Sequence, residues 1–263
     1  MVANVNIHHS AIIEDGAEIG DGTSVGPFCF VGSKVRLGQN VELKSHVVIK
    51  GDTFLGDENT VFPFAVLGEI PQDKKFNGES TSLKIGNRNQ IREHVTINIG
   101  TKGGGGITKV GNDGLFMAGC HIAHDAQVGD NVILVNNASL AGHCIIEDNV
   151  IVGGLSGVHQ FVRIGEGAII GAVTMVTNDV IPYGLVQAPR GELDGLNLVG
   201  LKRKGVPRAD IMALRAAFQT LSQGDGTFQD RAQKLTDDSD SEYVEKIVSF
   251  VLGQSDRSFL TPR

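Results

Sequence analysis

The sequence contains no tryptophan, and its 263 residues include only 2 tyrosines, 3 cysteines and 7 prolines. No apolar run reaches the roughly 18 residues of a membrane-spanning helix, so we expect no membrane span. The start, Met1–Ile7, lacks a basic stretch followed by an apolar one, so no secretion signal is expected. An odd number of cysteines in a long chain argues against a disulfide framework and favours a reducing compartment. We therefore expect a cytoplasmic protein.

Basic residues are also too few to suggest that the protein binds nucleic acid. The formal net charge is −7, and an acidic chain is a poor candidate for non-specific binding of nucleic acid. Glycine, in contrast, is abundant at 35 residues, while aromatic residues make up only 5%. This composition suits a fold with many tight turns and narrow interior layers.

A six-residue repeat is the main signal in the sequence. Every sixth residue is aliphatic across 7–67, across 85–97 and, with Phe116 as the one exception, across 110–176. Four residues after most of these aliphatic residues, the side chain is small or β-branched. Two superimposed columns of this kind indicate one repeating unit with a buried side.

A period of six does not fit the 3.6-residue period of a helix, but it fits short strands joined by tight turns. Glycine and asparagine near the turns supply the backbone conformations that corners need. Each hexad would form one face and one corner of a prism, and each coil would bury its aliphatic residues against the next. The sequence therefore predicts a mainly β protein, a parallel β-helix. Its exposed flat faces lead us to expect a homo-oligomer.

Interruptions of the repeat define the domain organisation. The segments at about 68–84 and 98–109 break the period and are polar, so we expect loops ejected from the coils. Loops on a rigid scaffold often carry binding groups. Beyond the repeat, apolar residues recur at helical spacing around 207–221 and again near the C-terminus. We therefore predict a β-helix over 1–189 and a small α-helical domain over 190–263.

Candidate chemistry gathers in one zone of the repeat. His124 and Asp125 are adjacent, and a histidine can remove a proton from a hydroxyl while a carboxylate orients it. Because neighbours on a strand point to opposite faces, this pair needs a corner geometry. The N–H of Gly142 could bind a developing oxyanion. Four of the eight histidines lie on neighbouring hexads here: His121, His124, His143 and His159.

The positions of these histidines allow more than one interpretation. His124 and His143 fall outside the inward columns, so we expect both on the outer surface, about one coil apart. A solvated histidine is the ordinary alternative. A zinc site formed by His121, His124 and His143 is another, since three converging histidines can hold zinc. We favour acid–base chemistry and expect no metal.

Other features have simpler interpretations. The three cysteines, Cys29, Cys120 and Cys144, fall in or near the small inward column and are expected to pack in the core. The glycine run at 103–106 matches no phosphate-binding loop, because no Lys-Ser/Thr follows it. The basic run at 202–204 is either a solvated surface or a site for phosphate or an acidic partner.

Several segments are more specific than the hexads. They are Gly26-Pro-Phe, Leu43-Lys-Ser-His-Val-Val, Gly68-Glu-Ile-Pro-Gln-Asp-Lys-Lys, Ile85-Gly-Asn-Arg-Asn-Gln-Ile-Arg-Glu, His121-Ile-Ala-His-Asp, Asn136-Asn-Ala-Ser-Leu-Ala-Gly-His, Val158-His-Gln-Phe and Gly200-Leu-Lys-Arg-Lys-Gly. Through them, nearly the whole chain resembles the UDP-N-acetylglucosamine O-acyltransferases of lipid A synthesis. The resemblance implies a left-handed β-helix and a homotrimer with active sites between subunits. It also implies transfer of a 3-hydroxyacyl chain from acyl carrier protein to the 3-hydroxyl of UDP-N-acetylglucosamine (UDP-GlcNAc), without a cofactor.

The resemblance also implies roles for individual residues. His124 would be the general base, Asp125 its orienter and Gly142 the oxyanion donor. Residues expected to position the sugar, acyl chain and phosphates are Asp73, Lys75, His121, His143, His159 and Gln160. Residues expected to contact the nucleotide are Asn197, Arg203 and Lys204. Acyl carrier protein is acidic, so a basic partner surface is expected despite the net charge.

Three positions depart from the family pattern. Lys204 stands where a second arginine is common, which removes a bidentate phosphate contact. Val199 stands where some members have glutamate, so one nucleotide hydrogen bond is in doubt. Ala172 occupies the position of the residue that limits acyl length, often glycine, and its methyl group predicts a shorter chain.

Related functions are also compatible with the sequence. The N-acyltransferase of the same pathway has a uridine-binding domain before its β-helix, and we expect none here because the hexads begin by Ile7. An acetyltransferase using acetyl-CoA, a trimeric scaffold and an enzyme that acylates a 3-amino sugar all stay open. Acyl length also stays undetermined.

Overall fold

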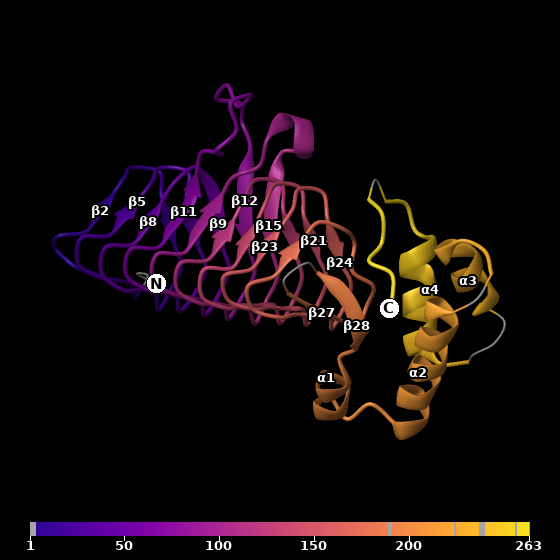
Figure 1. Ribbon diagram of the computed structural model, residues 1–263. Coiled ribbons are helices and arrows are strands. Elements are labelled where there is room, and N and C mark those ends of the chain that lie inside the picture. Colours follow the sequence, from indigo (N-terminus) through magenta and orange to yellow (C-terminus); the bar gives the residue numbers. More distant parts are fainter. Residues whose placement is uncertain (1–3, 189–190, 224, 237–239, 256, 263) are drawn as a thin grey trace.

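The structure is a computed structural model that describes residues 4–188, 191–223, 225–236, 240–255 and 257–262. Short strands wind into a long prism, and a cluster of helices lies at the end of the prism opposite the first coils (Figure 1). The prism is a left-handed parallel β-helix, as expected.

Three parallel sheets form the three faces of the prism, and we name them A, B and C. Sheet A contains β1 (Asn6–Ile7), β4 (Ser24–Val25), β7 (Glu42–Leu43), β10 (Thr60–Val61), β13 (Gln90–Ile91), β16 (Leu115–Phe116), β19 (Ile133–Leu134), β22 (Ile151–Val152), β25 (Ile169–Ile170), β27 (Gly184–Gln187) and β28 (Glu192–Leu196). Sheet B contains β2 (Ile12–Ile13), β5 (Phe30–Val31), β8 (Val48–Ile49), β11 (Val66–Glu69), β14 (Thr96–Asn98), β17 (His121–Ile122), β20 (Ser139–Leu140), β23 (Gly157–Val158) and β26 (Met175–Val176). Sheet C contains β3 (Glu18–Ile19), β6 (Arg36–Leu37), β9 (Asp52–Leu55), β12 (Ser82–Ile85), β15 (Ile107–Val110), β18 (Gln127–Val128), β21 (Ile145–Ile146) and β24 (Arg163–Ile164).

The register follows the repeat, with three hexads in each coil. Ser24 pairs with Glu42, and Glu42 pairs with Thr60, so each strand lies directly over the strand one coil earlier. The second residue of each two-residue strand points inward, and Leu134, Leu140 and Val152 are fully buried. Stacking of these aliphatic side chains holds neighbouring coils together.

The first coil departs from this pattern. Ile7 and Ile13 belong to the aliphatic column, yet 41% of Ile7 is exposed and Ile13 on the next face is only partly buried. No coil of the described residues lies beneath them to complete their burial. The three cysteines, in contrast, are buried and free, which confirms their role in packing.

Two asparagines occupy the interior column of small residues. Asn59 and Asn89 are 0% and 1% exposed and form a ladder. The Asn59 amide donates to the carbonyls of Gly56 and Gly86, and its oxygen accepts from the N–H of Asn89. The Asn89 oxygen in turn accepts from the N–H of Gly114. The contacts with Gly86, Asn89 and Gly114 connect the coils that precede and follow the two ejected loops.

The loops leave the prism on one side, above neighbouring coils (Figure 1). The first runs from 70 to 81, between β11 and β12, and the second from 99 to 106, between β14 and β15. Both are shorter than the expected spans, because strand pairing continues to Glu69 and resumes at Ser82 and Ile107. The second loop contains a short 3-10 helix, Lys102–Gly104.

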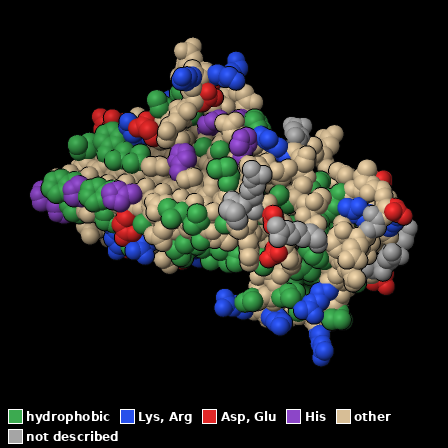
Figure 2. All heavy atoms as spheres, in the orientation of Figure 1, with side chains coloured by type: hydrophobic (Ala, Val, Ile, Leu, Met, Phe, Trp, Pro, Cys, Tyr) green, Lys and Arg blue, Asp and Glu red, His purple; other side chains and the backbone are tan. Residues whose placement is uncertain are grey.

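The corners between faces have a recurring backbone conformation. One residue of most corners has a positive φ, and many of these residues are not glycine. At the corner between sheets A and B, which we call the A–B corner, Phe28, His46, Phe64 and His94 stack with ring centroids 5.0–5.1 Å apart. Figure 2 shows the alternating histidine and hydrophobic side chains along this edge near the first coils.

The C-terminal part begins with a strand rather than a helix. The strand β28 pairs antiparallel with β27, so the sheet runs past the expected boundary at 189. Four helices follow: α1 (Leu198–Arg203), α2 (Arg208–Ser222), α3 (Phe228–Lys234) and α4 (Glu242–Leu252). None of these described helices is long and apolar enough to cross a membrane.

Helical spacing correctly predicted the buried side of α2. Ile211, Leu214 and Leu221 are buried there, Phe218 on the same spacing is only partly buried, and Ala217 beside it lies in the core. After α4 the chain returns to the last coil, where Phe259 bridges to Asp179.

The asparagine ladder yields a stability prediction. Replacing Asn89 with alanine leaves buried backbone groups of Gly111 and Gly114 without their partner. Because each unsatisfied buried group costs about 1–3 kcal/mol, we expect a loss of roughly 3 kcal/mol of stability. Thermal unfolding of the variant should show a clearly lower midpoint. The exposed Asn77→Ala serves as the control, and an equal midpoint for both variants would contradict the role of the ladder.

Candidate active site

The site is centred on a histidine–carboxylate pair at the corner between sheets B and C, which we call the B–C corner. The Nδ1 of His124 lies 2.8 Å from the Oδ2 of Asp125. Asp125 has a φ of 62°, the left-handed conformation that aspartate tolerates. This turn brings two sequence neighbours into contact, as the corner hypothesis requires. The carboxylate only accepts, so Nδ1 carries the proton and Nε2 is left as a base.

The ejected loop after β14 fixes the carboxylate. Thr101 donates its N–H to one carboxylate oxygen of Asp125 at 2.8 Å and its hydroxyl to the other at 2.6 Å. Gly104 packs against the same group, and a Cβ there would lie 2.1 Å from the carboxylate carbon. The backbone N–H of Asp125 donates to Thr108. The carboxylate is thus buried and held in place by the loop.

Burial of this pair corrects one expectation. We expected His124 on the outer surface, but it is 7% exposed and Asp125 is 3% exposed. His124 does lie outside the inward columns, yet the loop that carries Thr101 and Gly104 covers the corner. His143, one coil further, is partly exposed.

Gly142 lies against the imidazole of His124. A Cβ at Gly142 would come within 2.6 Å of Cε1 and 2.8 Å of Nε2, so only glycine fits beside this ring. Within the described part of the chain, no group accepts a hydrogen bond from the Gly142 N–H. A free N–H is therefore available next to the Nε2 atom of His124.

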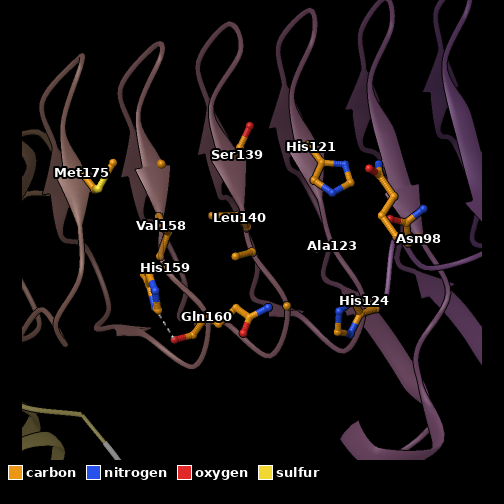
Figure 3. A pocket seen from close by; sticks show the side chains of 14 residues that line it. Asn98, His121, Ala123, His124, Ser139, Leu140, Val158, His159, Gln160 and Met175 are labelled. Atoms are coloured by element: carbon orange, nitrogen blue, oxygen red, sulfur yellow. Dashed lines mark hydrogen bonds between the residues drawn. The ribbon is translucent and has the colours of Figure 1, made fainter. Parts of the chain in front are cut away.

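A groove of about 400 Å³ runs along the outer side of sheet B and ends at this pair. We call it the sheet B groove. Figure 3 shows its lining residues on successive coils, with His121, Ser139 and Met175 in one row and His124 and Gln160 along the corner. Most of its lining surface is apolar, and the polar groups sit at its edges. Such a groove suits a chain-like apolar ligand with a polar head.

Two histidines beside the pair are kept neutral by their surroundings. Burial lowers the pKa of His121, and the nearby His124 adds to this effect. Burial also lowers the pKa of His143, although the Asp125 carboxylate opposes it. Neutral imidazoles can donate or accept one hydrogen bond at each nitrogen, and His121 already uses Nδ1 with the hydroxyl of Thr96 at 2.7 Å.

Asp73 and Lys75 lie on the first ejected loop. They line a second hollow, together with His143 and Phe161 of the B–C corner. His143 stacks on Phe161 with ring centroids 4.5 Å apart and therefore separates this hollow from the sheet B groove. The structure thus brings both loop residues to the neighbourhood of the pair.

The three nucleotide candidates lie elsewhere. Asn197, Arg203 and Lys204 line a pocket between α1 and the outer side of sheet A, which we call the α1 pocket. Asn197 caps α1 by accepting from the N–H of Gly200, and its amide donates to the carbonyl of Gly167. Because sheets A and B are different faces of the prism, one chain does not join this pocket to the sheet B groove.

Two departures from the family pattern are exposed. Val199 is 61% exposed on α1, and Ala172 is exposed at the A–B corner. Ala172 does not line the sheet B groove within this chain. Its effect on acyl length stays a prediction.

A possible metal-binding group also occurs at the pair. One ligand atom each from His124, Asp125 and His143 lies within 4.8 Å of the others. However, both carboxylate oxygens are occupied by Thr101, and Nδ1 of His124 is bonded to Asp125. Three free ligands do not converge on one point, so the donor set does not match a zinc site.

Sequence reasoning missed several groups around the site. Thr101 was not singled out, although the break in the repeat at 98–109 marked its segment as an ejected loop. Asn98 and Gln72 also line the sheet B groove. Arg257, near the C-terminus, contacts His159, and no local pattern relates two residues so far apart in sequence.

Hexapeptide-repeat acyltransferases are the class of protein that this fold and this site define. The bacterial transferase hexapeptide model matches residues 16–51, and the model described as UDP-N-acetylglucosamine O-acyltransferase, domain 2, matches residues 179–260.

Individual relatives agree with these matches. The acyl-[acyl-carrier-protein]–UDP-N-acetylglucosamine O-acyltransferase of Paracoccus denitrificans is 66% identical over 77% of both chains. The protein of that name from Agrobacterium fabrum is 43% identical over 100% of this chain and 97% of its own. The solved UDP-N-acetylglucosamine acyltransferase of Campylobacter jejuni covers 98% of this chain and 100% of its own, at 39% identity and a TM-score of 0.92. The chain belongs to the UDP-N-acetylglucosamine O-acyltransferase family.

The lowered pKa values predict how stability depends on pH. The unfolded chain protonates its histidines near about pH 6.5, whereas folded His121 and His143 stay neutral to lower pH. The unfolded state then binds more protons, so the free energy of unfolding falls as pH drops below about 6.5. Replacing His121 with glutamine should flatten this dependence, as measured by urea unfolding between pH 5 and pH 7.5. An unchanged slope would contradict the neutral state of His121.

Proposed function

We propose that this protein transfers a 3-hydroxyacyl chain from acyl carrier protein to the 3-hydroxyl of UDP-GlcNAc, the first step of lipid A synthesis. The observation that carries this proposal is the His124–Asp125 pair beside the free N–H of Gly142 at the end of an apolar groove. The names of the relatives support acyl carrier protein as the donor and UDP-GlcNAc as the acceptor.

His124 acts as the general base. Its Nδ1 donates to Asp125, so Nε2 can take the proton from the sugar hydroxyl as that oxygen attacks the thioester carbonyl. Asp125 stabilises the imidazolium that forms, as the buried carboxylate does in a Ser-His-Asp triad. The Gly142 N–H stabilises the oxyanion of the tetrahedral intermediate. Collapse of the intermediate releases the carrier thiolate, which takes the proton back from Nε2 of His124.

The groove holds the acyl chain. Its walls include Ala141, Gly157 and the exposed Met175, which suit methylene groups, and the chain would lie along successive coils toward His124. His121, His159 and Gln160 supply polar contacts beside it. Because the groove is open along one side in a single chain, a neighbouring subunit would close it.

The division of the site between two faces supports a homotrimer. The sheet B groove lies toward the B–C corner, and the α1 pocket lies toward the corner between sheets C and A, so each lies away from the A–B corner. A threefold arrangement around the A–B corner places sheet B of one subunit against sheet A of the next. The groove of one subunit and the α1 pocket of its neighbour then form one site, with nucleotide and acyl chain on opposite sides.

The A–B corner has the chemistry of a buried axis. Phe28, Phe64, Leu155 and Val173 are 49–66% exposed there, although large apolar side chains are costly to leave in water. Cyclic contact between three copies would cover them.

A basic surface near α1 fits an acidic carrier. Lys202, Arg203 and Arg208 are exposed, and Figure 2 shows the positive side chains gathered at this end of the molecule. Electrostatic attraction would favour encounter with acyl carrier protein and would weaken as salt is raised.

Mutation of the pair tests the mechanism. His124→Ala should lower kcat by about 10²–10⁴-fold, because general acid–base catalysis contributes that much, while the oligomer stays folded. Asp125→Asn should also lower kcat, since the amide no longer accepts the Nδ1 proton and favours the wrong tautomer. Acyl transfer from carrier-bound thioester is measured, with Arg215→Ala on the exposed side of α2 as the control. Wild-type activity of His124→Ala would end the general-base assignment.

A charge placed on the proposed axis tests the assembly. Phe64→Asp puts three carboxylates near one another and removes apolar contact, so the trimer should dissociate and activity should fall together with it. Ile145→Asp changes an exposed aliphatic residue of sheet C in the same way and is the matched control. Light scattering gives the mass of both variants. A monomeric wild type, or a Phe64→Asp trimer, would contradict the proposed axis.

A further inference from the structure

The chain beyond α4 forms a strap that returns to the β-helix. The carbonyl of Ser258 accepts from the N–H of Asp179 at 3.0 Å, and Leu260 donates to the carbonyl of Asp179 at 2.9 Å. Ser255 donates to the Asp179 carboxylate, which also binds Arg163 at 2.8 Å. The strap therefore has a fixed position beside the last coils, close to the end of the sheet B groove.

One arginine of the strap contacts a lining residue of that groove. The Nη2 atom of Arg257 lies 3.0 Å from the Nδ1 atom of His159 and 3.0 Å from the carbonyl oxygen of Gln160. His159 and Gln160 both line the sheet B groove. Arg257, which follows the last helix, thus contacts the wall of the groove with its side chain.

The chemistry of this contact fixes the proton of His159. A guanidinium has five donors and no acceptor, so the Nδ1 atom of His159 must be the acceptor of the bond. An accepting Nδ1 carries no proton, and the remaining proton of the neutral ring is on Nε2. The Nδ1 atom also lies 3.3 Å from the Gln160 carbonyl. The Gln160 carbonyl already accepts a hydrogen bond from Arg257. The Nδ1 atom of His159 therefore forms its hydrogen bond with Arg257 rather than with this carbonyl.

Two histidines that line the same groove consequently carry their proton on different ring nitrogens. His124 binds a carboxylate through Nδ1 and therefore presents Nε2 as an acceptor. His159 binds a guanidinium through Nδ1 and therefore presents Nε2–H as a donor. A base must accept a proton, whereas a residue that holds a substrate oxygen must donate one. The partner on Nδ1 decides which task each ring can perform.

We propose that Arg257 is a positioning residue that keeps His159 as a neutral Nε2–H donor toward an oxygen of the acyl donor. The inference rests on the proposed function, because it assigns the groove to the acyl donor. Arg257 acts through His159 and touches no reacting atom. Its loss leaves the His159 ring free to place its proton on either nitrogen, so the donor toward the groove is present only part of the time.

Kinetics of four variants test the proposal. Arg257→Ala should raise KM for the acyl carrier protein thioester about tenfold, with kcat changed less than twofold, because a contact made equally in ground state and transition state affects KM alone. Arg257→Lys, which also only donates, should recover most of the loss. Arg215→Ala, on an exposed turn of α2, is the control. His159→Gln places an amide N–H where Nε2–H was, without a tautomer to fix.

The double variant decides between positioning and a merely structural role. In the His159→Gln background, Arg257→Ala should change KM less than twofold, because no imidazole proton remains to be placed. An equal rise in KM in both backgrounds would overturn the proposal and assign Arg257 to the strap alone. Wild-type kinetics for Arg257→Ala would overturn it as well.

A spectroscopic readout is independent of activity. In protein labelled with ¹⁵N histidine, the Nδ1 atom of His159 should show the shift of an unprotonated ring nitrogen, and Arg257→Ala should move it toward an average of two tautomers. A protonated Nδ1 in the wild type would contradict the inference. A wild type that gives this shift but transfers no acyl chain would instead contradict the proposed function, so the two failures are distinguishable.

Discussion

The spacing of hydrogen bonds between stacked coils is the constraint on which the rest of this structure depends. Parallel strands lie about 4.8 Å apart, so equivalent side chains of successive coils must meet at nearly that distance. The rings of Phe28 and His46 follow it at 5.0 Å, and those of His143 and Phe161 at 4.5 Å. The B–C corner uses the same spacing, because Asp125 occupies in its coil the place that His143 occupies in the next.

Much of this architecture follows from the sequence because its signals are periodic. The aliphatic column predicts the prism, the two interruptions predict the loops, and helical spacing predicts α2 and α4. Adjacency of His124 and Asp125 predicts their contact once a corner is assumed. Periodicity says nothing about what an ejected loop covers, which is why the burial of His124 by the loop of Thr101 was not foreseen.

Contacts between distant segments form the other part that sequence could not supply. Arg257 meets His159 only because the strap folds back over the last coils. The interior asparagines, Asn59 and Asn89, stand in the column where the repeat predicts a small or β-branched side chain, and their carbonyl partners become visible only in three dimensions. The surroundings of Lys204 also become visible only in three dimensions. Burial lowers the pKa of its ammonium group, while Glu166 at 3.9 Å opposes this shift, and neither effect can be read from the basic run.

The two ends of the prism are unlike each other. Among the described residues, the first coil leaves Ile7 exposed and Ile13 only partly buried, whereas the last coils are covered by helices and held by the strap through Asp179. Since each coil rests only on its neighbours, local opening is expected to begin at the uncovered end and to advance one coil at a time. Local unfolding of the coils nearest Ile7 would then leave the coil that carries His121 folded. The site would therefore stay intact while the first coils open and close.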